Sequence, residues 1–199
     1  MHRVLTTADY RQTPWKNGGG RTTLLALHPP AADFARFAWR ASVADVATDG
    51  PFSEFAGVDR TLVLLRGAGM RLTGGAVALD VRAPYEPVAF AGDVACSCVL
   101  LDGPVQDFNL MVRRSEARAD VDVVRDQGIV ARPARFRLCY AASGACECLL
   151  PGLRPLRLNE HETLFVDAGD GAAPTLHVNP SSAAAVALVV VIDLVGGSA

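Results

Sequence analysis

The sequence lacks the features that would assign it to a membrane or to a nucleic acid. Its longest uninterrupted apolar run, residues 183–192, is too short to cross a bilayer, and it ends in β-branched residues that favour a buried strand. Residues 1–11 contain no apolar core of a signal peptide. Nineteen basic residues are set against twenty-one acidic ones, and no basic stripe is long enough to follow a phosphate backbone. We therefore expect a cytoplasmic protein with no nucleic-acid partner and no membrane partner.

Metal and nucleophile signatures are also scarce. The five cysteines are an odd number, and in the cytoplasm they are expected to be thiols. Two C-x-C pairs, Cys96 with Cys98 and Cys146 with Cys148, could in principle supply four sulfurs to zinc, but structural zinc sites usually separate paired cysteines by about two to four residues. No G-x-S-x-G elbow is present, and the four histidines are scattered. The sequence predicts no metal and no other cofactor.

What the chain does contain is a series of short strand signals separated by glycine turns, at the close spacing of an all-β barrel or sandwich. Helix signals are weak, with a candidate at residues 31–37 and a turn at 42–46. A charged stretch near 115–127 separates two strand-rich halves, so we place a domain boundary there. Strands are predicted at residues 21–27, 60–65, 69–72, 76–81, 94–101, 109–113, 135–141, 146–150, 163–166 and 185–194.

The most informative stretch is residues 14–20, which combine a proline, Trp15, the cation Lys16, the amide Asn17 and three glycines. Glycine is used where the backbone adopts a positive φ or approaches another group closely, and three in a row cost conformational entropy that a plain connector does not need. We interpret the stretch as a binding loop for a small molecule. The alternative is a flexible surface loop that leads into a strand, with Trp15 packed inward.

Three further stretches mix aromatic side chains with polar groups: W-R-A-S at 39–42, G-P-F-S-E-F-A-G-V-D-R at 50–60 and D-F-N-L-M-V-R at 107–113. Together with W-K-N-G-G-G-R-T at 15–22, they closely resemble the HutD/Ves family, whose pattern runs W-[KR]-N-x-x-G-x-T, W-R-x-S, G-x-F-S-x-F-x-G-x-[DE]-R and D-F-N-x-M-x-R. The resemblance is dense over residues 1–114 and continues beyond them in strand rhythm only.

The resemblance implies a fold and a function. The family is built as two cupin-like β-barrels in one chain, a bicupin. Here that implies one barrel in residues 1–120, which carries the motifs, and a second in 121–199, to which N-terminal strands could cross over. HutD members are associated with histidine utilisation and are thought to moderate it by binding a small anionic intermediate, such as urocanate or a formylated or formiminated glutamate. Cupins commonly dimerise, so the resemblance allows a homodimer.

The motif residues suggest how such an anion would be held. Lys16, Arg40 and Arg60 would meet a carboxylate, the arginines in a bidentate manner and the lysine as a point charge. Asn17 and Asn109 each offer both a donor and an acceptor, so they suit an amide, formyl or imidazole group. No residue is predicted to be catalytic. The predicted ligand-binding set is Trp15, Lys16, Asn17, Thr22, Arg40, Phe52, Ser53, Phe55, Arg60, Asp107 and Asn109.

Structural roles compete for several of these positions. Arg60 could form a clamp with a neighbouring carboxylate such as Asp59 or Glu54. Asp107 could cap a turn through its own backbone. Trp39 and Met111 are assigned to the core. Metal-dependent cupins bind their ion through closely spaced histidines and a glutamate on one strand, and the corresponding residues 55–67 contain no histidine.

One position departs from the family pattern. The family usually has a glutamate two residues after the threonine of the first motif, where this chain has Leu24. If that glutamate contacts the ligand in relatives, the specificity of this chain differs. If it is structural, another group must satisfy a cation such as Lys16 or Arg40.

Two other functions stay open on the sequence. The first is a metal-free cupin enzyme, an isomerase or hydrolase acting on a small carboxylic acid, with Asp107 or Glu54 and Lys16 as acid–base groups. The second is a stress-associated protein of the Ves type without a ligand from histidine breakdown. Consumption of a bound acid on prolonged incubation would favour the enzyme.

Overall fold

The computed structural model describes residues 1–33 and 36–196. Within these ranges the chain forms strands, turns and loops. The predicted all-β class is confirmed, but the expected few short helices are not found in the described ranges. Residues 42–46, predicted as a turn, lie inside a strand, and the candidate helix at 31–37 falls partly outside the described residues. In the part of the chain that the structure describes, no helix is long and apolar enough to span a membrane.

The chain divides into two compact units. Tyr10–Ala117 forms one of them, which we call the continuous unit. The other, which we call the split unit, combines Met1–Asp9 with Arg118–Ala199, so it is built from both ends of the sequence.

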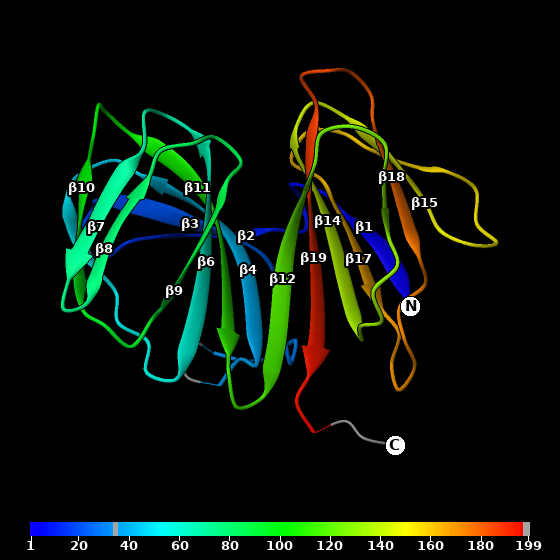
Figure 1. Cartoon of the computed structure of the whole chain (residues 1–199), viewed down its shortest axis with the longest axis horizontal. Coiled ribbons are helices and arrows are strands. Elements are labelled where there is room, and N and C mark those ends of the chain that lie inside the picture. Colours follow the sequence, from blue (N-terminus) through cyan, green and yellow to red (C-terminus); the bar gives the residue numbers. More distant parts are fainter. Residues whose placement is uncertain (34–35, 197–199) are drawn as a thin grey trace. The chain divides into compact units, whose positions relative to one another are not determined.

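The continuous unit consists of two antiparallel sheets (Figure 1). The six-stranded sheet, called the large sheet, has the strand order β2-β3-β4-β11-β6-β9, and the four-stranded sheet has the order β5-β10-β7-β8. The strands of the large sheet are β2 (Arg11–Pro14), β3 (Gly20–His28), β4 (Trp39–Val46), β6 (Val58–Arg66), β9 (Pro87–Ala91) and β11 (Val105–Arg113). Those of the smaller sheet are β5 (Gly50–Phe52), β7 (Met70–Gly74), β8 (Val77–Val81) and β10 (Cys96–Leu100).

Apolar side chains from both sheets form the core of the continuous unit. Leu62 and Leu64 on β6 and Met70 and Leu72 on β7 are fully buried in one cluster. These residues are two apart on their strands, and successive side chains on a strand point to opposite faces, so each pair presents one face to the interior. The core therefore fixes which face of the large sheet is turned inward, and the same face carries the polar residues described below.

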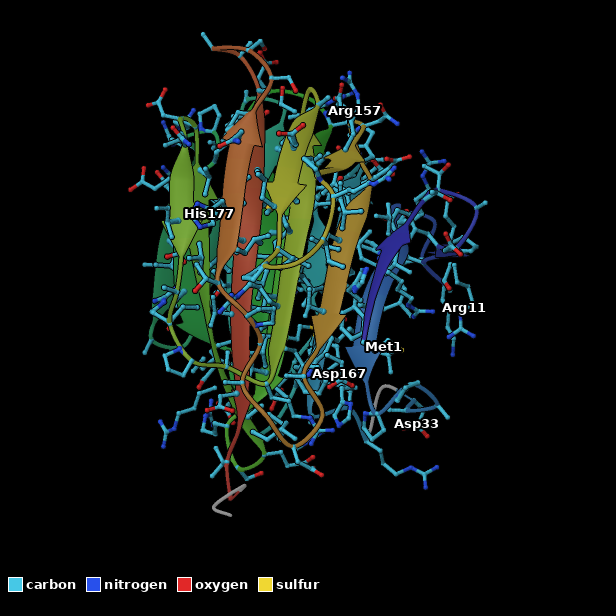
Figure 2. All side chains as sticks on the ribbon, turned by 90° about the vertical axis from the view of Figure 1, so that its right-hand side faces the viewer. Met1, Arg11, Asp33, Arg157, Asp167 and His177 are labelled. Atoms are coloured by element: carbon cyan, nitrogen blue, oxygen red, sulfur yellow. The ribbon has the colours of Figure 1, made fainter. Side chains whose placement is uncertain are left out.

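The split unit also contains two sheets, of five and four strands, in the orders β1-β17-β14-β19-β12 and β13-β18-β15-β16 (Figure 1). The N-terminal strand joins this unit through β17, and the Met1 amine donates a hydrogen bond to the Asp167 carbonyl at 2.6 Å. Figure 2 shows Met1 and Asp167 next to each other. The strands are β1 (His2–Leu5), β12 (Ala117–Val124), β13 (Gly128–Val130), β14 (Phe136–Ser143), β15 (Cys146–Leu149), β16 (Leu156–Leu158), β17 (Thr163–Asp167), β18 (Leu176–Pro180) and β19 (Val186–Leu194).

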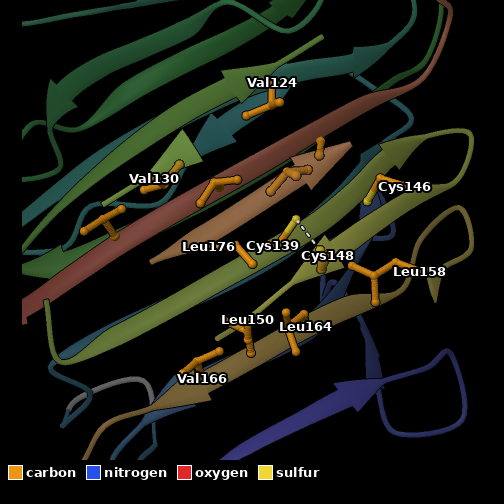
Figure 3. Packing of buried hydrophobic residues seen from close by; sticks show 14 of the residues in the cluster. Val124, Val130, Cys139, Cys146, Cys148, Leu150, Leu158, Leu164, Val166 and Leu176 are labelled. Carbon is orange, nitrogen blue, oxygen red and sulfur yellow. Dashed lines mark hydrogen bonds between the residues drawn. The ribbon is translucent and has the colours of Figure 1, made fainter. Parts of the chain in front are cut away.

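The interior of the split unit is filled with aliphatic residues and three thiols (Figure 3). Cys139 is fully buried and pairs in register with Leu164 on one side and Val189 on the other. The Cys139 and Cys148 sulfurs are 3.5 Å apart, and Cys146 lies with them. Buried thiols of this kind pack as small hydrophobic groups.

The charged stretch at 115–127, in which the sequence analysis placed a domain boundary, is mostly strand β12. Its sequence A-R-A-D-V-D-V-V alternates between small or apolar and charged residues, which is the pattern of a strand with one face turned to solvent. The strand was not predicted because the many charged residues of the segment made the alternation difficult to recognise.

Candidate functional site

A cavity of about 640 Å³ lies in the continuous unit. It brings together every member of the predicted ligand-binding set, although these residues come from four separate stretches of the sequence. The predicted residues that line it are Trp15, Lys16, Asn17, Thr22, Arg40, Phe52, Ser53, Phe55, Arg60, Asp107 and Asn109. The cavity has the size expected for a small-molecule site.

The register of the large sheet explains why these residues meet. Side chains directly opposite each other on antiparallel strands lie on the same face. Met111 on β11 is paired with Arg40 on β4 and with Arg60 on β6, and we call these three residues the cationic row. Two residues along β11, Asn109 is paired with Ser42, which forms the middle row with it. Asp107 lies a further two residues along β11, and we call this position the acidic row.

A β-bulge in β3 also shapes the cavity wall. Thr22 and Leu24 are paired with cavity-facing positions of β4, but the register shifts between Leu24 and Ala26. Because one extra residue reverses the alternation of side chains, Leu27 rather than Ala26 lines the cavity. Leu25 has no partner on β4 and is buried outside the cavity lining.

The glycine loop at the cavity edge is braced by its own side chains. The Trp15 indole nitrogen donates to the Thr22 hydroxyl at 2.8 Å, and the Gly19 amide donates to the Asn17 side-chain oxygen at 3.0 Å. A Cβ at Gly20 would lie 2.3 Å from the Asp45 carbonyl oxygen and 3.1 Å from the Trp15 ring. The loop is therefore ordered, with one acceptor of Asn17 already used for its structure.

Arg60 is the most deeply buried cation of the cavity, with 4% of its surface exposed. Its guanidinium carbon lies 4.2 Å from the centre of the Phe52 ring, and one of its nitrogens donates to the Ser53 carbonyl at 3.3 Å. Burial lowers the pKa of Arg60 to about 10, with Asp107 opposing that shift. The clamp with Asp59 is not formed, because Asp59 binds Arg114 at 2.7 Å instead.

Arg40 brings a second buried cation to the cationic row. Its guanidinium donates to the Ser42 hydroxyl at 3.1 Å and contacts the Met111 sulfur at 3.7 Å. Burial, and to a smaller extent the nearby charge of Arg11, lowers the pKa of Arg40 to about 10. Both arginines therefore remain protonated at neutral pH, in surroundings where an anion is poorly screened by water.

Asp107 and Asn109 carry acceptors that the protein does not satisfy. Asp107 is 1% exposed and lies within β11, so it does not cap a turn. Neither of its carboxyl oxygens, nor the side-chain oxygen of Asn109, has a hydrogen-bond partner among the described residues. Burial raises the pKa of Asp107 to about 7, while the charge of Arg60 opposes the rise and Asp45 adds to it.

Several residues outside the predicted set also line the cavity, and Arg11 and Leu24 are the most informative of them. Arg11 on β2 is paired with Leu24 on β3, and Leu24 is in turn paired with Ser42 of the middle row. Leu24, the position at which this chain departs from the family pattern, therefore lies between Arg11 and Ser42 of the middle row. Met111, assigned to the core, is 1% exposed and also lines the cavity, whereas Trp39 is fully buried.

The cavity lining combines two buried cations with a carboxyl group of raised pKa, but it does not offer a set of soft metal ligands. Among the described residues, one group of three potential metal ligands is found, Cys139 with Cys146 and Cys148 in the core of the split unit, with sulfurs within 4.8 Å of one another. Cys96 and Cys98 belong to the continuous unit, so the two C-x-C pairs are divided between the units.

Comparison with known proteins identifies close relatives. A family model described as HutD matches residues 7–186. An uncharacterized 21.2 kDa protein in the hutC 3' region of Pseudomonas putida is 33% identical over 168 residues, which cover 84% of this chain and 88% of that protein. Protein Ves of Cronobacter sakazakii is 39% identical over 141 residues, covering 69% of this chain and 76% of that protein.

Solved structures agree with these relatives. HutD from Pseudomonas fluorescens SBW25 superposes with a TM-score of 0.82 at 30% identity, over 98% of this chain and 100% of that one. A cupin 2 conserved barrel domain protein from Leptotrichia buccalis superposes with a TM-score of 0.54 at 8% identity, over 87% of this chain and 88% of that one. The second likeness shows the cupin fold alone.

Proposed function

The chain belongs to the HutD family, and from this premise we propose that it binds a small anionic metabolite of histidine breakdown in the cavity of the continuous unit. Urocanate and the formyl and formimino derivatives of glutamate are the candidate ligands. The names of two relatives, HutD and a protein in the hutC 3' region, support the histidine pathway.

The observation that carries the proposal is the buried Arg60 of the cationic row. A buried charge is costly unless an opposite charge or a set of hydrogen bonds compensates it. Arg60 is compensated by aromatic rings and a single carbonyl at 3.3 Å, and its Nε has no partner among the described residues. A carboxylate in the cavity would supply the missing charge and acceptor.

A thermal-shift panel of urocanate, formiminoglutamate, formylglutamate, histidine and glutamate tests this function. A ligand at about 100 times its Kd stabilises the folded state by roughly 2.7 kcal/mol. Arg60→Met is expected to remove the shift, and Arg71→Gln is the matched control, because Arg71 lies in the same unit but forms an exposed salt bridge with Asp80 at 2.7 Å. A panel without any shift would contradict the proposal.

The location of the ligand can be tested separately, because Lys16 is the only lysine in the sequence. An amine-specific acylating reagent has therefore two targets, the Lys16 amine at the cavity and the Met1 amine in the split unit. A bound ligand should slow acylation of Lys16 and leave Met1 unchanged, as measured by mass spectrometry of peptides. Equal protection of both amines would contradict binding in the cavity.

Asp107 favours a second candidate function, a metal-free cupin enzyme. A carboxyl group whose pKa burial raises to about 7 is suited to take and return a proton at neutral pH. Incubation of each panel compound with the protein, followed by chromatography, distinguishes the two functions. Loss of a compound with wild-type protein but not with Asp107→Asn would establish turnover, and full recovery of every compound would leave binding alone.

A further inference from the structure

The acidic end of the cavity shows which kind of group a ligand has to present there. Asp107 and Asn109 are two apart on β11, so both side chains lie on the cavity face of the large sheet. Together they offer three buried oxygens that lack a hydrogen-bond partner among the described residues. Buried acceptors without donors are rare in folded proteins and costly to leave so.

The three rows place Asp107 apart from Arg40 along the strands. Residues two apart on a strand are separated by about 7 Å. The Arg40 guanidinium reaches forward to the Ser42 hydroxyl of the middle row, at 3.1 Å. The guanidinium and the Asp107 carboxyl group are therefore separated by about one such spacing, which is the length of a small metabolite.

The two ends are chemically opposite and do not neutralise each other. Within the described residues, Asp107 forms no salt bridge, although Arg60 lies close enough to act on its charge. The guanidinium of Arg60 is turned to the Phe52 ring and the Ser53 carbonyl. An occupant that touched only the cations would leave the three acceptors unsatisfied.

We infer that the ligand is dipolar, with a carboxylate at Arg40 and Arg60 and a nitrogen head that donates N–H bonds to Asp107 and Asn109. Imidazole, amidine and amide groups are heads of this chemistry. The inference rests on the proposed function and adds that Asp107 and Asn109 select the head, whereas the cationic row supplies affinity for the carboxylate. A carboxylate with an apolar head of the same shape would bind more weakly, because burial would leave the acceptors unpaired.

Two pairs of probes test the inference by calorimetry at pH 7.5. Each pair has a carboxylate in common and differs in the head: urocanate against thienylacrylate, and formiminoglutamate against glutarate. Wild-type protein should bind the N–H compound of at least one pair about 10- to 100-fold more tightly, the range for a hydrogen bond to a charged group. Asp107→Asn should remove most of that preference while the apolar partner keeps its affinity, and Arg71→Gln should change neither.

Each outcome decides one of the two claims. Equal affinities within both pairs would overturn the dipolar ligand and leave the anion site standing. Failure of all four probes to bind would overturn the proposed function itself. Asn109→Leu is the second variant, for the case that Asp107→Asn does not fold. A preference that survives in the variant that folds would also overturn the inference.

Discussion

Each of the two units consists of a pair of antiparallel sheets, but the residues in their interiors differ in polarity. In the split unit the row Leu164, Cys139 and Val189 crosses three strands with apolar side chains, each of them fully buried. In the continuous unit the corresponding kind of row contains Arg40 and Arg60 around Met111 and borders a cavity. The same arrangement of strands therefore encloses a filled apolar core in the split unit and borders a cavity in the continuous unit.

Their buried arginines show the difference most clearly. Arg137 of the split unit is fully buried and donates to two backbone carbonyls, those of Pro174 and Arg132. Arg60 of the continuous unit is nearly as buried but has a single carbonyl partner. The Nε of each arginine lacks a partner among the described residues, so the two differ in their carbonyl acceptors, two for Arg137 and one for Arg60, and in the cavity that borders Arg60.

The largest effect is expected from truncation in the filled core. Leu164→Ala should lower the free energy of unfolding by about 2–5 kcal/mol, because a rigid apolar core does not close over the missing atoms. Leu24→Ala, at a half-buried residue that lines the cavity, should cost less than about 1 kcal/mol because it enlarges a space that already exists. Urea unfolding measures both, and equal costs would contradict the contrast between the units.

A smaller effect is expected from the two arginines. Arg137→Met should lower the free energy of unfolding by about 1–3 kcal/mol, because the carbonyls of Pro174 and Arg132 lose their donor. Arg60→Met should cost less, since it removes a poorly compensated charge and keeps an apolar stem. If Arg60→Met destabilises the protein as much as Arg137→Met, Arg60 is a structural residue.

Asp107 of the continuous unit should make the free energy of unfolding depend on pH. The pKa of Asp107 is raised from 3.8 to about 7, so between these values the folded state retains a proton that the unfolded state has lost. This contribution to stability is present below pH 3.8 and is lost as the pH rises to about 7, with a slope of at most about 1.4 kcal/mol per pH unit.

Asp107→Asn should remove this dependence, so its stability relative to wild type should rise between pH 5 and about 7 and then stay constant. The charged and titratable groups close enough to interact electrostatically with Asp107 are Arg60 of β6, Asp45 of β4 and Cys98 of β10. Urea unfolding at a series of pH values measures the effect. Parallel profiles of the variant and wild type would contradict it.

The smallest effect on stability is expected from Leu24→Glu. The new carboxylate would lie between Arg11 and Ser42, near the cationic row, and would change the free energy of unfolding by less than about 0.5 kcal/mol. It should nevertheless weaken binding of an anion about tenfold, because the cavity would contain its own counter-charge. Leu24→Gln, of similar size without the charge, is the control. Equal affinities of the two variants would show that position 24 does not act through charge.

Much of the fold could be predicted because strand length and turn chemistry are local properties. The strands predicted from residues 60–65, 146–150 and 185–194 are all confirmed within a few residues. Strand β4 was missed because W-R-A-S-V-A-D-V is buried on both faces of the sheet and shows no alternation. A buried strand of this kind cannot be distinguished from other buried segments by periodicity.

The site was harder to predict than the fold because it depends on register. Motifs singled out Arg40, Arg60 and Asp107, but nothing in the sequence placed Arg11 opposite Leu24. The bulge after Leu24 decides that Leu27, rather than Ala26, lines the cavity. A single inserted residue reverses every later side chain on a strand, so pattern alone could not give this set.

The strand β1 has a consequence for the order in which the units can be completed during synthesis. It leaves the ribosome long before its partner β17, because Met1 and Asp167 are separated by 166 positions. At the usual elongation rate, the nascent β1 waits on the order of ten seconds for that partner. The continuous unit needs no such delay, since all its strands emerge in one uninterrupted segment. The continuous unit can therefore be completed on the ribosome while β1 is still unpaired.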